Sequence, residues 1–205
     1  MGGALVRGKA MSKTVEFFFD FMSPPSYLAY TQLPAVAARA NASIAWRPLY
    51  TIGLHLLTGN QSPIMVPAKG AWIGQDLQRF AQRYGVVYVA NPHQPVKVVP
   101  ALRGAIVAQE EGFFAPYAEA VFSAMWREGV DIGDPGELRK ILLQAGLDAD
   151  LVARRIGEPS IKAALAANTQ EAADRGAFGA PSFFVDGVLH WGQDRLDFVE
   201  EALHA

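Results

Sequence analysis

The chain of 205 residues contains no cysteine. It can therefore form no disulfide and perform no dithiol redox chemistry of its own, and it carries no internal sign of an oxidising compartment. An excess of positive charge is missing as well, since the formal net charge is −2. That balance offers no electrostatic footprint for nucleic acid or for an anionic membrane surface. We therefore expect a protein that binds neither.

Clustered metal ligands and long apolar runs are two further absences. The histidines lie scattered, without carboxylate or histidine partners at zinc-ligand spacing, so we expect no metal site; they are His55, His93, His190 and His204. No apolar run approaches the roughly 20 residues that a membrane-spanning helix needs. The segment Met1–Met11 lacks the hydrophobic stretch of a secretory signal. We expect residues 1–13 to be a disordered extension and the protein to be cytoplasmic.

The residues that are present are those of an ordinary globular protein. Hydrophobic residues make up 51% of the chain and charged residues 19%, which suffices for a sizeable core. Aromatic and β-branched residues at Thr14–Phe19 predict a buried strand. A helix is expected over Pro24–Ala40, kinked or interrupted at Pro34, and a second strand over Ile44–Pro48. This β-α-β order predicts that the two strands are parallel.

The middle of the chain has helical patterning, and strands return near its C-terminus. Helices are expected around Trp72–Tyr84, Val98–Glu110, Pro116–Glu128, Pro135–Ala145, Asp148–Ile156 and Ser160–Asp174. Two strands, Ser182–Val185 and Val188–His190, flank a tight turn at Asp186-Gly187, and a helix over Asp194–Leu203 ends the chain.

This order of elements predicts an α/β fold with two parts. A thioredoxin-like β-α-β…β-β-α core is expected from residues 14–50 plus 176–205. A large all-α insertion over residues 51–175 would interrupt it, and because the core strands come from both ends of the chain, the two parts should be coupled.

The turn between the first strand and the first helix, Ser23-Pro24-Pro25-Ser26, is the main candidate site. Thioredoxin-like proteins place a reactive cysteine at this junction, where a helix N-terminus favours a negative charge. A serine cannot do that redox chemistry, but its hydroxyl can donate a hydrogen bond to the thiolate of another molecule, and glutathione is the obvious one. The alternative is that Ser23 simply caps the helix, with Ser26 a residue of the first turn.

Two further segments support the functional interpretation. Gly179-Ala180-Pro181 precedes the third strand, where a thioredoxin-like fold has its cis-proline loop, opposite Ser23; the backbone of Ala180 can then pair with an extended peptide. Without Ser23, Pro181 would be an ordinary strand-initiating proline. Gly192-Gln193-Asp194 follows the hairpin, and its amides and carboxylate suit an amino-acid head group. The alternative for Asp194 is that it caps the last helix.

Taken in order, these motifs resemble those of the 2-hydroxychromene-2-carboxylate isomerase family, which also contains the kappa-class glutathione transferases. The resemblance covers nearly the whole chain after Lys13. It is carried by Phe19-Asp20-Phe21-Met22-Ser23-Pro24-Pro25-Ser26-Tyr27-Leu28-Ala29, Arg47-Pro48, Thr58-Gly59-Asn60, Asn91-Pro92-His93, Phe178-Gly179-Ala180-Pro181 and Gly192-Gln193-Asp194-Arg195.

The resemblance implies a glutathione site and a homodimer. Ser23 matches the serine that hydrogen-bonds the glutathione sulfur, and Ala180, before the cis-proline Pro181, matches the residue that pairs with the cysteinyl backbone. Contacts to the glycyl end are implied for Asn60 and Lys69, and contacts to the γ-glutamyl group for Gln193 and Asp194. Two positions depart from the family pattern, which more often has serine at Gln193 and an aromatic residue at Gln94.

The activity that the resemblance implies is isomerisation of a small aromatic pyruvate derivative with glutathione as the catalyst. Thiolate addition to the conjugated alkene would leave a single bond that rotates, and expulsion of the thiol would restore the alkene. A kappa-type glutathione transferase or peroxidase is the alternative that Gln94 keeps open. A third hypothesis is a non-catalytic thioredoxin-like protein that binds peptides in the cis-proline groove.

Overall fold

The computed structural model describes residues 12–205, so residues 1–11 of the expected N-terminal extension lie outside the described part of the chain. Strand β1 (Thr14–Phe19), helix α1 (Pro24–Arg39) and strand β2 (Ser43–Pro48) open the fold, and β1 and β2 are parallel. Strands β3 (Ser182–Val185) and β4 (Val188–Trp191) complete a sheet with the order β2-β1-β3-β4. The predicted thioredoxin-like order of elements is confirmed.

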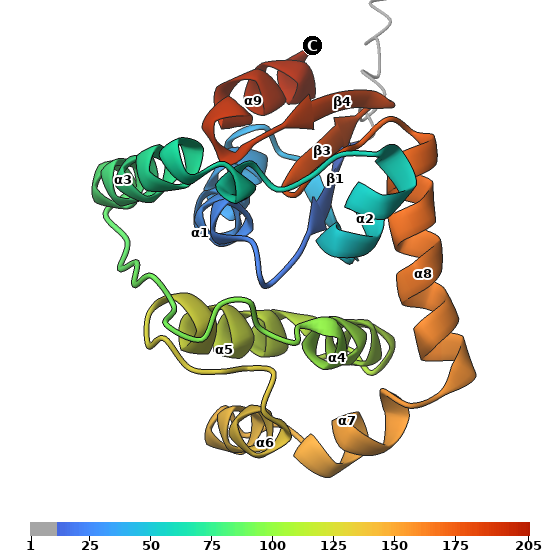
Figure 1. Cartoon of the computed structure of the whole chain (residues 1–205). Coiled ribbons are helices and arrows are strands. Elements are labelled where there is room, and N and C mark those ends of the chain that lie inside the picture. The colour runs from blue at the N-terminus through green and yellow to red at the C-terminus, as the bar shows by residue number, and fades with distance from the viewer. Residues whose placement is uncertain (1–11) are drawn as a thin grey trace, which may run out of the picture.

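Helices fill the chain between β2 and β3. They are α2 (Thr51–Thr58), the 3₁₀ helix η1 (Pro63–Met65), α3 (Pro67–Tyr84), α4 (Val99–Glu110), α5 (Phe114–Trp126), α6 (Pro135–Gln144), α7 (Ala149–Arg155) and α8 (Pro159–Asp174). After the hairpin come the 3₁₀ helix η2 (Gln193–Arg195) and α9 (Leu196–His204). In Figure 1, α4 and α5 form a layer below the sheet, α6 and α7 lie farthest from it, and α8 returns along one side to the sheet.

Alternation along the strands gives the sheet two apolar faces. Phe17 and Phe183 stack with ring centroids 5.1 Å apart and belong to the main core, which includes residues of α1, α4, α5 and α9. Phe18 and Phe184 point to the other face, where they pack with Leu54 of α2 and with residues of α8. Both faces are therefore covered by helices, as expected for a strand that is buried along its length.

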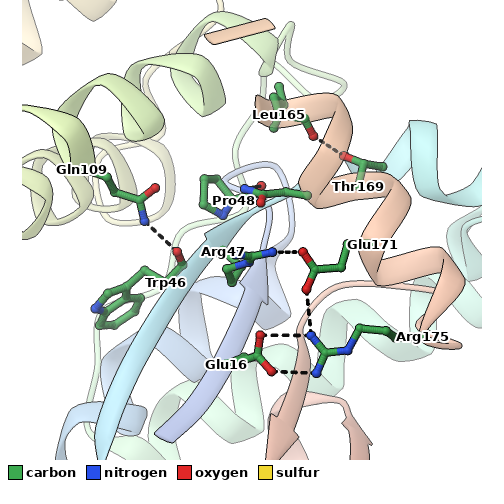
Figure 2. Close-up of polar contacts among 10 residues, drawn as sticks. Glu16, Trp46, Arg47, Pro48, Gln109, Leu165, Thr169, Glu171 and Arg175 are labelled. Atoms are coloured by element: carbon green, nitrogen blue, oxygen red, sulfur yellow. Dashed lines mark hydrogen bonds and ion pairs between the residues drawn. The ribbon is translucent and has the colours of Figure 1, made fainter. Parts of the chain in front are cut away.

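A chain of charged side chains joins α8 to the sheet (Figure 2). Arg175, just after α8, donates hydrogen bonds of 2.6 and 3.0 Å to the carboxylate of Glu16 on β1, and one of 2.9 Å to Glu171. Glu171 also pairs with Arg47 of β2. The guanidinium of Arg175 lies 3.9 Å from the centroid of the Phe184 ring. These contacts fix the end of the helical segment to the centre of the sheet.

The sequence-based expectations differ from the structure at two helices. An interruption at Pro34 does not occur, because α1 runs unbroken from Pro24 to Arg39, while the alternative of a kink there stays a prediction. Pro34 lies on the exposed side while Leu33, Val36 and Ala37 are buried, and this packing holds the helix together despite one missing amide donor. Helix α2 was not predicted at all, although it begins directly after β2 and positions part of the site.

Candidate active site

Ser23 lies at the N-terminus of α1, and its hydroxyl has two partners. The oxygen accepts a hydrogen bond of 3.2 Å from the amide of Ser26, which makes Ser23 the N-cap of the helix. The hydroxyl also donates a 3.0 Å hydrogen bond to the carbonyl oxygen of Ala180, 157 residues further along the chain. The capping interpretation is thus correct, and the same side chain also faces the cis-proline loop.

The Ala180–Pro181 peptide bond is cis, as predicted. The loop that contains it is held on both sides: the Ser182 hydroxyl donates a 2.7 Å hydrogen bond to the Gly179 carbonyl, and the Gly192 amide donates one of 3.1 Å to the Pro181 carbonyl. Pro181 and Ser182 are buried, while Ala180 is partly exposed. The Gly192 contact places the segment that begins with Gln193 beside the cis-proline.

Asn60 reaches the same loop from the end of α2. Helix α2 ends at Gly59, whose φ of +69° is a left-handed conformation that glycine adopts without strain. The Asn60 side-chain amide then donates a 2.7 Å hydrogen bond to the carbonyl of Phe178. Lys69 is exposed near the start of α3, and its side chain makes no hydrogen bond or ion pair with any residue of the described range 12–205. A hydrogen bond thus joins Asn60 to the cis-proline loop, and no corresponding contact within residues 12–205 joins the side chain of Lys69 to it.

Gln193 and Asp194 differ in their surroundings. Gln193 is buried. The Tyr84 hydroxyl donates to the side-chain oxygen of Gln193 at 2.8 Å and to its backbone carbonyl oxygen at 3.1 Å. Burial and the nearby Asp194 carboxylate raise the pKa of Tyr84 to about 12, so its hydroxyl stays a donor at neutral pH. Asp194 is exposed and makes no capping hydrogen bond to α9, whose N-cap is Arg195. The interpretation of Asp194 as a simple helix cap is therefore wrong.

Asp20 is a residue of this site that the sequence analysis did not single out, although it is a lone carboxylate in an apolar run. It is fully buried, and its carboxylate accepts hydrogen bonds of 2.9 Å from the amides of both Met22 and Thr51. Its backbone carbonyl accepts the Ser23 amide at 3.0 Å. Burial raises the pKa of Asp20, partly offset by these hydrogen bonds. Asp20 therefore holds the Ser23 turn against the start of α2.

Gln94 approaches the same turn from the irregular segment between α3 and α4. Its side-chain amide donates a 3.2 Å hydrogen bond to the carbonyl of Met22, the residue before Ser23. The neighbouring His93 is exposed, and its backbone amide donates to the Asn91 side chain at 2.8 Å. Gln94, which departs from the family pattern, is thus at the edge of the candidate site.

These contacts form a closed circuit around the site. Ser23 contacts Ala180, Phe178 of the same loop contacts Asn60, Asn60 follows α2, and the start of α2 contacts Asp20, whose backbone contacts Ser23. No group of three or more potential metal-ligating side chains is clustered within residues 12–205. Nor is any helix in this range long and apolar enough to cross a bilayer.

The fold and this site define a thioredoxin-like protein of the DsbA type. Residues 14–204 match the DSBA-like thioredoxin domain family. A 2-hydroxychromene-2-carboxylate isomerase of Sphingobium xenophagum is 33% identical over 94% of this chain and 99% of its own. Human glutathione S-transferase kappa 1 is 26% identical, over 94% and 92% of the two chains. A solved 2-hydroxychromene-2-carboxylate isomerase superposes with a TM-score of 0.83 at 28% identity, covering 93% of this chain and 94% of that one.

The chain belongs to the 2-hydroxychromene-2-carboxylate isomerase family, with kappa-class glutathione transferases as further relatives.

Proposed function

We propose that the protein is a glutathione-dependent isomerase that acts on 2-hydroxychromene-2-carboxylate or a related aromatic pyruvate adduct. The observation that carries the proposal is the position of the Ser23 hydroxyl, at a helix N-terminus and 3.0 Å from the carbonyl that precedes cis-Pro181, in a chain that has no thiol. The names of the relatives support the choice of substrate.

The residues of the site fit a cysteine-containing peptide. When bound, glutathione would supply a thiolate that adds to the conjugated alkene and leaves after rotation, so that it is unchanged overall. Ser23 would hold the sulfur, and the first amides and dipole of α1 would favour its ionised form. The Ala180 carbonyl, next to Ser23, would accept the cysteinyl N–H. Each unit by which the thiol pKa falls corresponds to about 1.36 kcal/mol of preference for the thiolate.

The ends of the peptide would contact the flanking segments. Asp194, exposed beside the cis-proline loop, would bind the ammonium of the γ-glutamyl group, with buried Gln193 beside it. Asn60 would contact the glycyl end. Lys69, which has no ionic partner in the described range, would meet the glycyl carboxylate. Because glutathione must be reduced to act in this way, we propose a cytoplasmic location.

A kappa-type glutathione transferase or peroxidase is the second candidate. The kappa relatives support it, and Gln94 is the local feature in its favour, because it places a carboxamide where the family more often has an aromatic ring. The same glutathione site would then serve a different acceptor. The third hypothesis, a non-catalytic peptide-binding protein, predicts weak glutathione binding that does not depend on Ser23.

Calorimetry of glutathione binding to the wild type and to Ser23→Ala tests the proposal. We expect saturable binding and a bound thiol pKa below that of free glutathione, raised again in the variant. Turnover of 2-hydroxychromene-2-carboxylate, against turnover of transferase and peroxide substrates, then separates the two enzymes. Gln94→Phe should change these substrate preferences and leave the glutathione affinity unaltered. Absence of glutathione binding would rule out both enzymatic functions.

A further inference from the structure

The Ser23 hydroxyl is already fully engaged in the structure. It has one proton, which it donates to the Ala180 carbonyl at 3.0 Å, since a carbonyl oxygen can only accept. Its oxygen meanwhile accepts the Ser26 amide at 3.2 Å. In this arrangement the hydroxyl has no proton left for a thiolate.

We propose that Ser23 and Ala180 form a hydrogen-bond pair that exchanges partners when a cysteinyl residue binds and its sulfur ionises. The cysteinyl N–H takes over the Ala180 carbonyl, and the Ser23 proton turns about the Cβ–Oγ bond to the sulfur. The Ser23 oxygen stays on the Ser26 amide, so the cap of α1 is kept throughout. This inference rests on the proposed function and concerns how the same site lowers the thiol pKa.

The exchange makes the two contacts depend on each other. If the ligand has no N–H at this position, turning the hydroxyl to the sulfur leaves the Ala180 carbonyl without a hydrogen-bond donor. The net stabilisation of the thiolate is then smaller. If the ligand has the N–H, the carbonyl remains satisfied and the full hydrogen bond goes to the sulfur. The structure thus assigns part of the thiol activation to the ligand's own amide, and that part should act only through the Ser23 hydroxyl.

The test is a two-by-two measurement of thiol pKa in the complex, read from thiolate absorbance across pH. The ligands are glutathione and its depsipeptide analogue, in which an ester oxygen replaces the cysteinyl N–H; the proteins are the wild type and Ser23→Ala. Each pKa is taken relative to that of the free ligand, and saturating ligand is used. In the wild type we expect the analogue to have a bound thiol pKa higher by about 0.4–1.1 units, the equivalent of one net hydrogen bond. In Ser23→Ala the two ligands should give the same shift.

Two matched variants test whether the effect of Ser23→Ala comes from the Ser23 hydroxyl. Ser23→Thr keeps a hydroxyl at the same position and should retain the difference between the ligands. Ser26→Ala removes a neighbouring hydroxyl that does not contact Ala180, and it should retain the difference as well. Loss of the difference in Ser26→Ala would overturn the assignment to Ser23.

A measurement without ligand tests the starting state. The carbonyl carbon of Ala180 should show a different NMR shift in the wild type and in Ser23→Ala, because only the wild type has the hydroxyl donor. Identical shifts, or a ligand difference that persists in Ser23→Ala, would overturn the exchange. If glutathione binds with a lowered thiol pKa but without this coupling, the proposed function stands and the exchange is wrong. If glutathione does not bind the wild type, both the proposed function and the exchange are wrong.

Discussion

Asp20 contacts both the turn that carries Ser23 and the start of α2. A buried carboxylate normally has a cationic partner, yet within residues 12–205 no salt bridge reaches Asp20. Its two oxygens are instead each bound by a backbone amide, one beside Ser23 and one at the start of α2. Because the carboxylate is the acceptor for both of these partly buried amides, it determines how the two segments lie together.

Removing this carboxylate should destabilise the protein strongly. Asp20→Ala removes the acceptor of two partly buried amides, and we expect a loss of about 2–5 kcal/mol in the free energy of unfolding, measured by urea denaturation. Asp20→Asn keeps one acceptor oxygen and should lose less. Equal stabilities of the two variants would show that the amides find other partners.

The stability difference between the wild type and Asp20→Asn should also depend on pH. Burial raises the pKa of Asp20 above its usual value of 3.8, so the folded state holds this proton to higher pH than the unfolded state does. The contribution of Asp20 is therefore greatest below the usual pKa and falls as pH rises through the raised one. Asp20→Asn does not titrate, so the wild type should lose stability relative to it over that window. If the wild type instead gains stability relative to Asp20→Asn as pH rises, the expectation is wrong.

Tyr84 should act on glutathione binding through Gln193. Its hydroxyl is the donor to both oxygens of Gln193, so Tyr84→Phe leaves the buried side-chain oxygen unsatisfied and loosens the segment that carries Asp194. We expect the dissociation constant of glutathione to rise about 3- to 10-fold, the equivalent of one net hydrogen bond, with the bound thiol pKa unchanged. Calorimetry measures the dissociation constant, and thiolate absorbance across pH measures the pKa of the bound thiol.

The matched control is Tyr88→Phe. Tyr88 stacks on Trp126, and its hydroxyl makes no hydrogen bond within the described range, so the affinity should not change. If both variants weaken binding equally, the effect is not specific to the contact with Gln193.

The contact between α8 and the sheet combines charge with aromatic packing. The guanidinium of Arg175 donates two hydrogen bonds to the carboxylate of Glu16 and lies over the Phe184 ring. The side chains of Arg175 and Glu16 are each less than one-third exposed. Paired, partly buried groups of this kind are stronger than exposed ion pairs. The contact joins the last helix of the central segment to β1 and β3.

Arg175→Ala should lower the free energy of unfolding by about 1–3 kcal/mol at neutral pH, because it removes the fork and the cation–π contact. Arg175→Lys should lose less, since it keeps a charge but not the planar fork. Arg175 lowers the pKa of Glu16, so this stabilisation is present above the usual carboxyl pKa and is lost as pH falls through the lowered one. Urea denaturation at neutral and acidic pH should show the effect of Arg175→Ala shrinking in acid.

The sequence predicted the elements well where a segment is rich in aromatic and β-branched residues or where turn chemistry is specific. The strand Thr14–Phe19, the turn Asp186-Gly187 and cis-Pro181 are confirmed. Helix α2 was missed because only Leu54 of its eight residues is buried, which leaves no periodic apolar stripe to recognise.

The site was predicted only in part for a similar reason. Ser23 and Ala180 were found because their segments have local signatures. Asp20 and Tyr84 act through partners 31 and 109 residues away, a separation that no local pattern encodes. Their roles depend on how the chain is packed rather than on the residues beside them.

The candidate site is built from residues at both ends of the chain and in the segment between them. Ser23 and Ala180 belong to the proposed thioredoxin-like part, residues 14–50 plus 176–205, whereas Asn60 and Gln94 come from residues 51–175. Hydrogen bonds link these contributions directly. The division of the chain at residues 50 and 176 remains a proposal, but any movement between the two parts would change the site itself.

We also propose that the protein is a homodimer, and its exposed apolar side chains indicate where the second copy binds. Leu56 of α2 is 80% exposed, Met65 of η1 is 71% exposed and Trp72 of α3 is 58% exposed. They flank Asn60 and Lys69 in the sequence, so burying them would also cover one end of the proposed glutathione site. Large exposed apolar side chains gathered in one segment are typical of an interaction surface.

Sedimentation velocity should therefore give a mass about twice that of the 22.2 kDa chain. Leu56→Lys and Met65→Lys place charges in this surface and should shift the protein toward the monomer, with weaker glutathione binding because Asn60 and Lys69 become more exposed. Leu143→Lys is the control, since Leu143 is also exposed but lies on α6, at the far end of the molecule from the sheet (Figure 1). A monomeric wild type would contradict the dimer. Dissociation by Leu143→Lys alone would place the interface on α6, and the glutathione site would then be complete within one chain.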